Sequence, residues 1–584
     1  HDTSAQRFVL TPKSFGQESL TTGIYSFGNN NYRISSLGNG VYTIYSLTQN
    51  GFCAANGNGS MYFAASSDAA EAKWLVTKTS DGYVFQSAAH QTYMTSDAGL
   101  SSNAENISIS DLNASVTDYS MKYDLSALNA LDSLNGIQVI SRLHTLGLSR
   151  SDLMNPEANM TSLNTNIQSA LSGLPTQTVQ YTGTDVDDLN QFLQNNTGKI
   201  VQLTQDIQVY KNTNGSFGII MVPSDTILDG TGHRLVMKAG YTEAPDVGVV
   251  LYVYKDGVIP STNCGVKNLS TDIPYVNSIN VFSADNILIE NNTLNNATKS
   301  GIMISDEYGS TVNGIIRGNT INNVGDDAIA VYGNHSNLLI DSNRISGAKG
   351  FAGIAISCLQ NGQQIRVDNE TTGPHDIIVT GNVISGCSGE ALYCIGSYKT
   401  YITYNTLRDS ILEGVCLDSG CIGNYFAHNE VVNNGIAGGL PGVSIDNGIY
   451  NIVDSNNIYN NSCSGIKLVR TGLGNIIVNN ICTDNAYNQM GAKSSGIDIE
   501  PLAVETENLG YIDGLGSNWN VVLNNTVTGS HDFGVFIADD DTANNGGSSC
   551  ENVIMYNKFS SAYTFGAADF SSMSSTVKNN ITLN

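Results

Sequence analysis

Acidic side chains are the residues of this sequence best suited to do chemistry. The segment GDDAIAV places Asp326 and Asp327 side by side. Asp306, Glu390 and Glu413 are the other acids that we expect to meet this pair. Two carboxyl groups facing one glycosidic bond can cleave it, because one protonates the leaving oxygen and the other activates a water molecule. These five acids are therefore the candidate catalytic residues, with no metal or cofactor required.

Aromatic and charged side chains further along the chain could hold a polymer. Tyr332 and Tyr393 have flat faces on which sugar rings can stack. The charged candidates for substrate binding are Asp418, Asp446, Lys467, Arg470, Asp498 and Glu500. Neighbouring carboxylates raise one another's pKa, which keeps one acid protonated near neutral pH.

Each candidate also has a plain structural interpretation. A Gly-Asp-Asp bend can be a turn that satisfies backbone N–H groups, and Glu390 and Glu413 can be solvated strand ends. Lys467 and Arg470 can be ion-pair partners of the acids rather than catalytic groups. Outward acids can also bind Ca²⁺ for stability.

A repeat would position these residues. The phrase apolar-x-x-Asn-x-apolar returns about ten times from Leu288 onward, as in IENNTL, IRGNTI and ITYNTL, mostly at spacings of 23 to 27 residues. Its asparagines are Asn292, Asn319, Asn343, Asn382, Asn405, Asn429, Asn456, Asn479, Asn525 and Asn557. Because asparagine tolerates left-handed backbone conformation, we expect these residues at the bends between strands, stacked as a ladder of amides.

A second repeated phrase predicts the strands. A small residue followed by apolar-x-apolar recurs between the asparagines, as in SGIMIS, DAIAVY and EGVCLD. Such alternation marks strands, and strands this short must be buried against equivalent strands of neighbouring coils. The predicted fold is all-β, a right-handed parallel β-helix solenoid. Aligning its coils gives one column that reads Ser300, Asp327, Ala352, Glu390, Glu413, Pro441 and Ser464.

The rest of the chain suggests three parts. Residues 1–123 lack the repeat and read as a small β-rich module that binds a carbohydrate or another partner. Residues 124–178 have helical spacing and are expected to be a short helical linker. The β-helix is expected over 179–584, with a short helix at 186–197 that covers its first coil.

Composition narrows the partners. The formal net charge is -26, which disfavours nucleic acid because polyanions are repelled. No apolar run is long enough to span a membrane. Ten cysteines and Asn-x-Ser/Thr triplets, such as that at Asn58, fit a secreted glycoprotein with disulfides. A polysaccharide is the expected partner, and self-association is the other expected contact.

The repeat resembles the pectate-lyase-like superfamily of β-helices, and the GDDAIAV segment resembles that of polygalacturonases and dextranase-type glycoside hydrolases. This resemblance implies a secreted inverting glycoside hydrolase. The chain departs from the polygalacturonase pattern at two positions. Ser300 stands where that family has an aspartate, and Ala352 lies where that family has the segment that contains its histidine. A polysaccharide lyase or epimerase, or a non-enzymatic filament or adhesin protein with a β-helix stalk, remain the alternatives.

Overall fold

The computed structural model describes most of the chain, and it divides the chain into two compact units, His1–Asn113 and Ala114–Asn584. The described residues are 23–27, 30–36, 41–46, 51–64, 69–90, 92–97, 99–108, 110–111, 125–134, 136–211, 218–254, 257–360, 363–364, 373–437, 439–486, 495–499, 516–538, 549–560, 563, 565–571 and 575–583.

The first unit is an antiparallel β module. Its ten strands are β1 (Gly23–Phe27), β2 (Asn30–Ser36), β3 (Val41–Ser46), β4 (Gly51–Ala55), β5 (Met61–Ala64), β6 (Lys73–Thr79), β7 (Gly82–Ser87), β8 (Tyr93–Met94), β9 (Leu100–Ser101) and β10 (Ser110–Asp111), with one 3-10 turn at Ala70–Ala72. Its core is aromatic: Tyr32, Tyr42, Trp74 and Phe85 are fully buried. The Trp74 indole N–H donates to the Cys53 carbonyl at 2.8 Å, which satisfies the only polar atom of that side chain.

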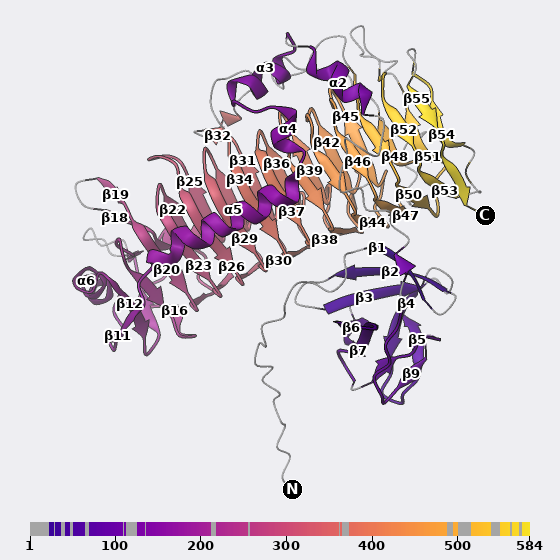
Figure 1. The fold of residues 1–584 in the computed structure, drawn as a ribbon. Coiled ribbons are helices and arrows are strands. Elements are labelled where there is room, and N and C mark those ends of the chain that lie inside the picture. The colour runs from indigo at the N-terminus through magenta and orange to yellow at the C-terminus, as the bar shows by residue number, and fades with distance from the viewer. Residues whose placement is uncertain are drawn as a thin grey trace. The chain divides into compact units, whose positions relative to one another are not determined.

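The second unit is a solenoid of three long parallel sheets (Figure 1). Each coil contributes one strand to sheet 3, then one to sheet 1 and one to sheet 2.

Sheet 1 has 15 strands: β11 (Gln177–Tyr181), β12 (Lys199–Leu203), β15 (Ile227–Asp229), β20 (Thr262–Lys267), β23 (Asp285–Glu290), β26 (Val312–Arg317), β29 (Ser336–Asp341), β34 (His375–Thr380), β37 (Tyr398–Thr403), β40 (Tyr425–Ala427), β43 (Ile452–Asp454), β46 (Ile476–Val478), β49 (Val521–Leu523), β52 (Val553–Met555) and β55 (Thr576–Lys578).

Sheet 2 has 14 strands: β13 (Ile207–Val209), β16 (Arg234–Met237), β21 (Ser270–Thr271), β24 (Thr293–Asn295), β27 (Thr320–Asn322), β30 (Arg344–Ser346), β35 (Val383–Ser385), β38 (Thr406–Arg408), β41 (Glu430–Val432), β44 (Asn457–Tyr459), β47 (Ile481–Thr483), β50 (Thr526–Thr528), β53 (Lys558–Ser560) and β56 (Ile581–Leu583).

Sheet 3 has 13 strands: β14 (Ile220–Met221), β17 (Val247–Val250), β22 (Asn277–Phe282), β25 (Ile302–Ser305), β28 (Ile329–Tyr332), β31 (Ile354–Ser357), β36 (Leu392–Ile395), β39 (Val415–Asp418), β42 (Val443–Asp446), β45 (Ile466–Val469), β48 (Ser495–Ile499), β51 (Phe533–Ile537) and β54 (Phe565–Asp569). Two hairpins extend from the coils, β18 (Tyr252–Tyr254) with β19 (Val258–Pro260), and β32 (Leu359–Gln360) with β33 (Gln363–Gln364).

The interior of the solenoid is a continuous apolar column. The residues predicted to point inward from sheet 3, such as Ile302, Ile304, Ile329 and Val331, have no exposed surface. The parallel strand pairs place them directly above one another, Ile302 on Ile329 and Ile329 on Ile354. The prediction of a β-helix is therefore confirmed, and each coil is buried by its two neighbours.

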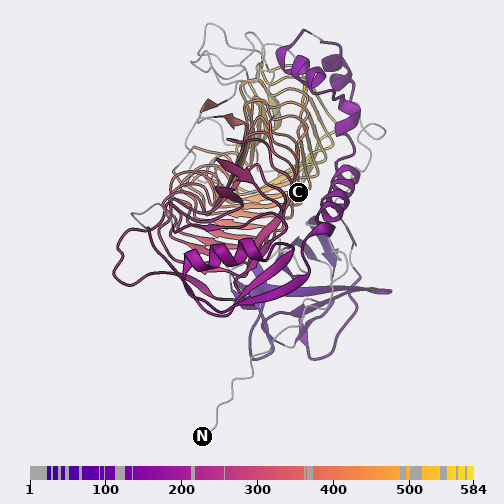
Figure 2. The same ribbon diagram turned by 90° about the vertical axis from the view of Figure 1, so that its left-hand side faces the viewer.

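Helix α6 (Val186–Asn195) covers the first coil, as predicted for 186–197 (Figures 1 and 2). The Asp185 side chain accepts a hydrogen bond from the Asp187 backbone N–H at 2.9 Å, which caps the start of the helix. Leu189 and Leu193 are fully buried in the same apolar cluster as the coils. Asn190 donates to the Ile219 carbonyl and accepts from Met221, so it satisfies the otherwise open edge of β14.

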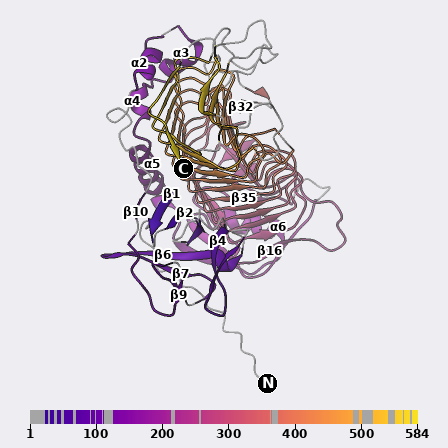
Figure 3. The same ribbon diagram turned by 90° about the vertical axis from the view of Figure 1, so that its right-hand side faces the viewer.

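Four further helices cover the outer face of sheet 1: α2 (Ser126–Asp132), α3 (Gln138–Thr145), α4 (Arg150–Leu153) and α5 (Pro156–Ala170), the last followed by a 3-10 turn at Leu171–Gly173 (Figures 1 and 3). They lie in the segment predicted as a linker. Leu163 and Ile167 of α5 share an apolar cluster with outward residues of sheet 1 such as Leu288 and Ile315. Because sheet 1 is apolar on both faces, it needs this cover.

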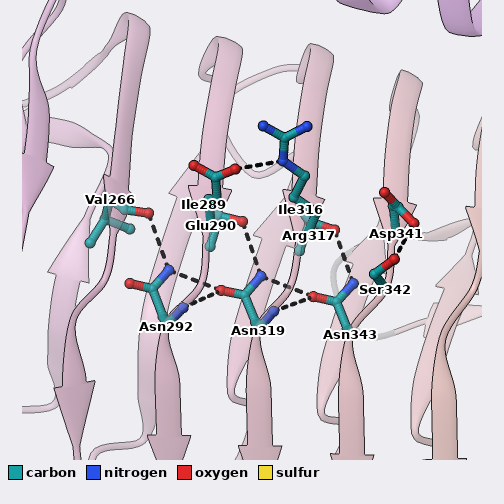
Figure 4. Close-up of polar contacts among 10 residues, drawn as sticks. All are labelled: Val266, Ile289, Glu290, Asn292, Ile316, Arg317, Asn319, Asp341, Ser342 and Asn343. Carbon is teal, nitrogen blue, oxygen red and sulfur yellow. Dashed lines mark hydrogen bonds and ion pairs between the residues drawn. The ribbon is translucent and has the colours of Figure 1, made fainter. Parts of the chain in front are cut away.

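Asparagine side chains join successive coils at the corner between sheets 1 and 2 (Figure 4). The Asn343 Oδ1 accepts from both the backbone N–H and the side-chain amide of Asn319, at 3.0 Å each. The Asn319 amide also donates to the Ile289 carbonyl at 3.0 Å. The predicted amide ladder is therefore present, and it satisfies backbone groups that are buried at the bend.

Two details of the predicted ladder were wrong. The ladder passes through Asn480 rather than Asn479, because Asn456 contacts Asn480 and Asn480 contacts Asn525. The left-handed conformation belongs to the residue before each ladder asparagine, as at Ser342 with φ 55°. The bend is thus made by the preceding residue, and the asparagine supplies the hydrogen bonds.

Candidate functional site

The column predicted from the sequence lies at the edge of sheet 3. The register of sheet 3 aligns Ile329 with Ile354, Ile354 with Leu392, and Leu392 with Val415. Asp327, Ala352, Glu390 and Glu413 each lie two residues before one of these aligned positions. Because strands are about 4.8 Å apart, the backbones of Glu390 and Glu413 are about 5 Å apart, and those of Asp327 and Glu390 about 10 Å.

Asp327 is fully buried and hydrogen-bonded at both oxygens. Its Oδ1 accepts from the Ala352 backbone N–H at 2.8 Å, and its Oδ2 is bonded to the Tyr332 hydroxyl. Burial raises the pKa of Asp327 to about 7, against the lowering effect of these two hydrogen bonds. The charges of Asp326 and Glu390 add to the rise. Asp327 is therefore tied to the next coil, as expected of a turn-capping acid.

Glu390 and Glu413 have no such ties. Only 6% of Glu390 is exposed, and its Oε2 has no hydrogen-bond partner among the residues that the structure describes. Burial raises the pKa of Glu390, and the charge of Asp418 adds to this effect. Glu413 is partly exposed, and burial followed by the charge of Glu390 raises its pKa to about 7. Among the described residues, neither glutamate forms an ion pair with a basic side chain.

The charged residues further along the strands form ion pairs with one another. Arg470 Nη1 lies 2.9 Å from Asp446 Oδ2 and 3.5 Å from Asp418 Oδ1. The Tyr393 hydroxyl donates to Asp418 Oδ2 at 2.8 Å. Burial raises the pKa of Asp446 to about 8. The charge of Asp418 adds to this rise, and the charge of Arg470 only partly offsets it.

Lys467 pairs with the buried Asp498 on the next coil, with Nζ 3.3 Å from Oδ2. The interpretation of Lys467 and Arg470 as ion-pair partners is thus supported by their geometry. Glu500 lies outside the described residues.

Asp306 does not join the catalytic candidates. It follows β25 and lies beside Gly333 of the next coil. Gly333 is six residues further along the chain than Asp327. At about 3.3 Å per residue this corresponds to about 20 Å along the strand direction. Its Oδ2 accepts from the Asn334 backbone N–H at 3.1 Å. Asp326 is partly exposed and lies beside Gly350 of the following coil.

Tyr332 and Tyr393 are less accessible than stacking on a sugar ring would require. Tyr393 is only 9% exposed, and its ring meets Phe351 edge-on at a centroid distance of 4.8 Å. The ring of Tyr332 is partly exposed, but its hydroxyl is bonded to Asp327. Phe351, Tyr393, Cys416 and Ala355 belong to a small apolar cluster on the outer face of sheet 3. This cluster was not predicted from the sequence, and it provides apolar surroundings on the sheet face that carries the acids.

The raised pKa of Glu413 leads to a prediction about stability. The ordinary pKa of the group is 4.5 and its folded value is about 7. Between these pH values the unfolded chain releases the proton while the folded chain keeps it, so the folded state loses stability as the pH rises. Glu413→Gln removes this loss. We expect the melting temperature of the variant, relative to the unchanged protein, to rise between pH 4.5 and 7, measured by differential scanning calorimetry; a pH-independent difference would contradict the shift.

The predicted disulfides are absent. Among the described residues, which include all ten cysteines, no two cysteines form a disulfide. Nine of the ten are buried. Cys394 illustrates the reason, because it occupies an inward position stacked on Ile356 and Leu417, where it acts as a small apolar side chain.

In the part of the chain that the structure describes, no group of three or more His, Cys, Asp or Glu side chains is arranged to hold a metal ion. None of the helices there combines the length and apolar character that crossing a membrane requires.

Comparison with known proteins agrees with the observed coil. Residues 251–431 match the family model described as "Right handed beta helix region". The chain is a right-handed parallel β-helix protein. A search of curated proteins found no match to this chain.

Several solved structures are similar to it at low identity. The A-module of the mannuronan C-5 epimerase AlgE6 of Azotobacter vinelandii is 15% identical, with a TM-score of 0.38, covering 69% of this chain and 100% of the module. The surface adhesin PfbA of Streptococcus pneumoniae is 11% identical, with a TM-score of 0.35, covering 64% and 84%. A mutant tailspike protein of Escherichia coli bacteriophage HK620, solved with a hexasaccharide, is 13% identical, with a TM-score of 0.40, covering 67% and 73%.

Proposed function

We propose that this β-helix protein is a glycoside hydrolase acting on a polysaccharide, with Glu413 as the acid and Glu390 as its partner. One observation carries the proposal: two glutamates occupy one column on adjacent coils, and the nearly buried Glu390 has an oxygen without a hydrogen-bond partner among the described residues. Burying carboxylates without opposite charges destabilises a fold. Perturbed acids that are grouped on one face are therefore more typical of a reaction centre than of a structural element.

The two glutamates suit the two roles. A pKa of about 7 leaves much of Glu413 protonated near neutral pH, so it can give a proton to the leaving glycosidic oxygen. Glu390, nearly buried and with one oxygen lacking a hydrogen bond, can attack the sugar or activate water as the bond breaks. In the route where Glu390 attacks, the leaving sugar departs with the proton of Glu413, and the remaining sugar stays bonded to Glu390. Glu413 then takes a proton from an incoming water molecule, whose oxygen attacks the sugar carbon and breaks its bond to Glu390, so both glutamates return to their starting states.

Charge favours a neutral polymer as the substrate. The net charge of the chain is -26, and the candidate face carries Asp326, Glu390 and Glu413 together. Such a face repels an anionic polymer and leaves a neutral one unaffected. A substrate of this kind occurs outside the cytoplasm, so an extracellular or periplasmic location is part of the proposal.

The experiment that tests the proposal is release of reducing ends from two neutral polymers, dextran and xylan, and two acidic ones, polygalacturonate and alginate. We expect release from a neutral polymer. The absence of product from every polymer would contradict the hydrolase proposal and favour a non-enzymatic role, such as that of an adhesin or a filament protein.

Stereochemistry identifies which pair of acids acts. Carboxyl groups about 5–5.5 Å apart are typical of retaining enzymes, and those about 6.5–9.5 Å apart of inverting enzymes. The adjacent coils of Glu390 and Glu413 fit the first spacing, whereas Asp327 and Glu390, two coils apart, fit the inverting reaction favoured by the sequence. We expect NMR of the first product to show the retained anomer; the inverted anomer would instead assign the second role to Asp327.

A polysaccharide lyase or epimerase is the second candidate. It is favoured by Arg470, whose guanidinium lies near the carboxylates of Asp446 and Asp418, next to the Tyr393 hydroxyl. In such enzymes a cation neutralises the substrate carboxylate while a base removes the neighbouring proton. Product from an acidic polymer with new absorbance near 235 nm, from the unsaturated sugar, would support a lyase and contradict the hydrolase.

A further inference from the structure

An exposed aromatic cluster lies on the same side of the solenoid as the acids. It consists of Tyr252, Phe282 and Tyr308. The rings of Tyr252 and Phe282 lie 5.2 Å apart between centroids, and those of Phe282 and Tyr308 lie 5.5 Å apart. Tyr308 is 50% exposed, whereas Tyr252 and Phe282 are partly buried, so Tyr308 presents most of the accessible aromatic surface of the cluster.

The cluster is aligned with the acid column by the strand register. Phe282, Ser305 and Tyr332 are equivalent positions on three successive coils of sheet 3. Phe282 is therefore about 10 Å from Tyr332 along the solenoid axis. Tyr332 is bonded to Asp327, so the cluster continues the candidate site in the direction of the N-terminal coils.

Three separate elements hold the rings in place. Tyr252 is on β18, the first strand of a hairpin that extends from the coil (Figure 1). Phe282 is the last residue of β22. Tyr308 is in a turn closed by a hydrogen bond from the Gly309 N–H to the Asp306 carbonyl at 2.9 Å.

That turn is fixed to both neighbouring coils. The Asp306 side chain accepts from the Asn334 N–H at 3.1 Å, and the Ser283 hydroxyl donates to the Gly309 carbonyl at 2.6 Å. These bonds fix the backbone of the turn that carries Tyr308 before any ligand arrives. A residue on a fixed turn loses less conformational entropy on binding than one on a free loop, as expected of a recognition residue.

We propose that Tyr252, Phe282 and Tyr308 form a stacking subsite for a sugar ring of the polymer whose bond is cleaved at Glu390 and Glu413. The ligand class rests on the proposed function. A sugar presents an apolar face of C–H groups, and an exposed tyrosine presents a flat face with a polar edge. Phe282 lies on the same sheet as the acids, level with Ile395 of the coil that carries Glu390. It is four coils, about 19 Å, from Glu390 along the solenoid axis and about 16 Å from it along the strand direction, a span that a polymer of several sugar units covers and a single sugar does not.

The test is affinity electrophoresis of the full chain through gels that contain dextran, xylan, polygalacturonate or alginate. The expected result is that one gel retards the unchanged protein, and that Tyr308→Ala weakens the retardation about tenfold. Tyr308→Phe should keep it, because the flat face remains. Tyr556→Ala is the control, since Tyr556 is 39% exposed at the corner between β52 and β53.

Two results would overturn the subsite. Retardation of Tyr308→Ala equal to that of the unchanged protein excludes the ring as a ligand contact, and retardation by none of the four gels excludes the polymer. Failure of the hydrolase proposal gives a different result from failure of the subsite: a gel would retard the protein, but no reducing ends would be released. Cleavage that is lost in Glu413→Gln while gel retardation remains would support the subsite and the site of cleavage separately.

Discussion

Glu413→Gln is expected to lower the rate of polysaccharide cleavage by about 10²–10⁴-fold, because the amide cannot give a proton to the leaving oxygen. Glu390→Gln should cause a loss of similar size by removing the partner carboxylate. The two losses should not add in the double variant, since both groups act on the same bond. Initial rates on the polymer that releases reducing ends measure all three variants.

The loss should not come from unfolding. Removing a partly buried carboxylate that has no cationic partner among the described residues should stabilise the fold above the ordinary pKa of the group. The melting temperature of Glu413→Gln should therefore equal or exceed that of the unchanged protein at pH 7. An inactive variant that melts lower would not count as support.

Glu430→Gln is the matched control. Glu430 is on sheet 2, only 2% exposed, and accepts from the Tyr459 hydroxyl at 2.5 Å. The same chemical change is thus made on another face, in a glutamate about as buried as Glu390 and more buried than Glu413. Full activity is expected, because the amide oxygen can still accept from Tyr459. Undiminished cleavage in both Glu390→Gln and Glu413→Gln would exclude the proposed pair.

The register of the acids could be predicted because the repeat itself encodes it. Once Ile329, Leu392 and Val415 are assigned to one inward position, the residues two places earlier must align as well. The column of Asp327, Glu390 and Glu413 therefore followed from counting. Period-two alternation fixes which face each side chain takes, and a slip by one residue would turn the apolar set outward.

Burial on the outer face could not be predicted in the same way. Tyr393 points outward, yet Phe351 from the preceding coil covers it. Asp306 has a tempting interval from Asp326, yet it lies about six residues further along the strand direction. Both errors have one cause: the repeat specifies direction and register, whereas side chains and turns of neighbouring coils determine exposure.

The cover on sheet 1 did leave a signal in the sequence. Runs such as NILIE, NGIIR and SNLLI are continuously apolar at their centres, unlike the alternating phrases of sheet 3. Continuous apolar runs are typical of strands buried on both faces. The helical spacing of 124–178 was recognised, but its apolar positions were not matched to these runs. Leu163 packs against the face that they form.

Asn405→Ala is expected to lower the free energy of unfolding by about 3 kcal/mol, the largest loss of stability among the changes considered. The Asn405 amide donates to the carbonyls of Val379 and Thr403 at 2.9 and 3.0 Å. Its Oδ1 accepts from the Asn382 backbone N–H at 2.9 Å. Alanine removes the side-chain partner of the Val379 carbonyl and of the Asn382 N–H, whereas the Thr403 carbonyl still accepts from the Gly381 N–H at 3.2 Å. Each buried group left unsatisfied costs about 1–3 kcal/mol. Guanidinium unfolding monitored by circular dichroism measures the change.

Asn322→Ala is the control, because it removes an asparagine amide that lies outside the buried ladder. Asn322 is partly exposed on β27, and its amide donates to Asn295 Oδ1 at 2.9 Å. Water can replace that contact, so the expected loss is below about 1 kcal/mol. Equal losses in the two variants would contradict the importance of burial at the ladder.

Asn405→Asp separates the role of the donors from that of the acceptor. The carboxylate keeps an oxygen for the Asn382 N–H but cannot donate to the Val379 carbonyl, and it places a charge in a site that is 1% exposed. Burial should raise the pKa of this aspartate, so stability should fall as the pH rises from its ordinary pKa to the raised one.

Because each coil contacts only its neighbours, faster hydrogen exchange in this variant should be confined to β37, β38 and the adjoining strands. Faster exchange along the whole solenoid would contradict this prediction and would mean that the ladder couples distant coils.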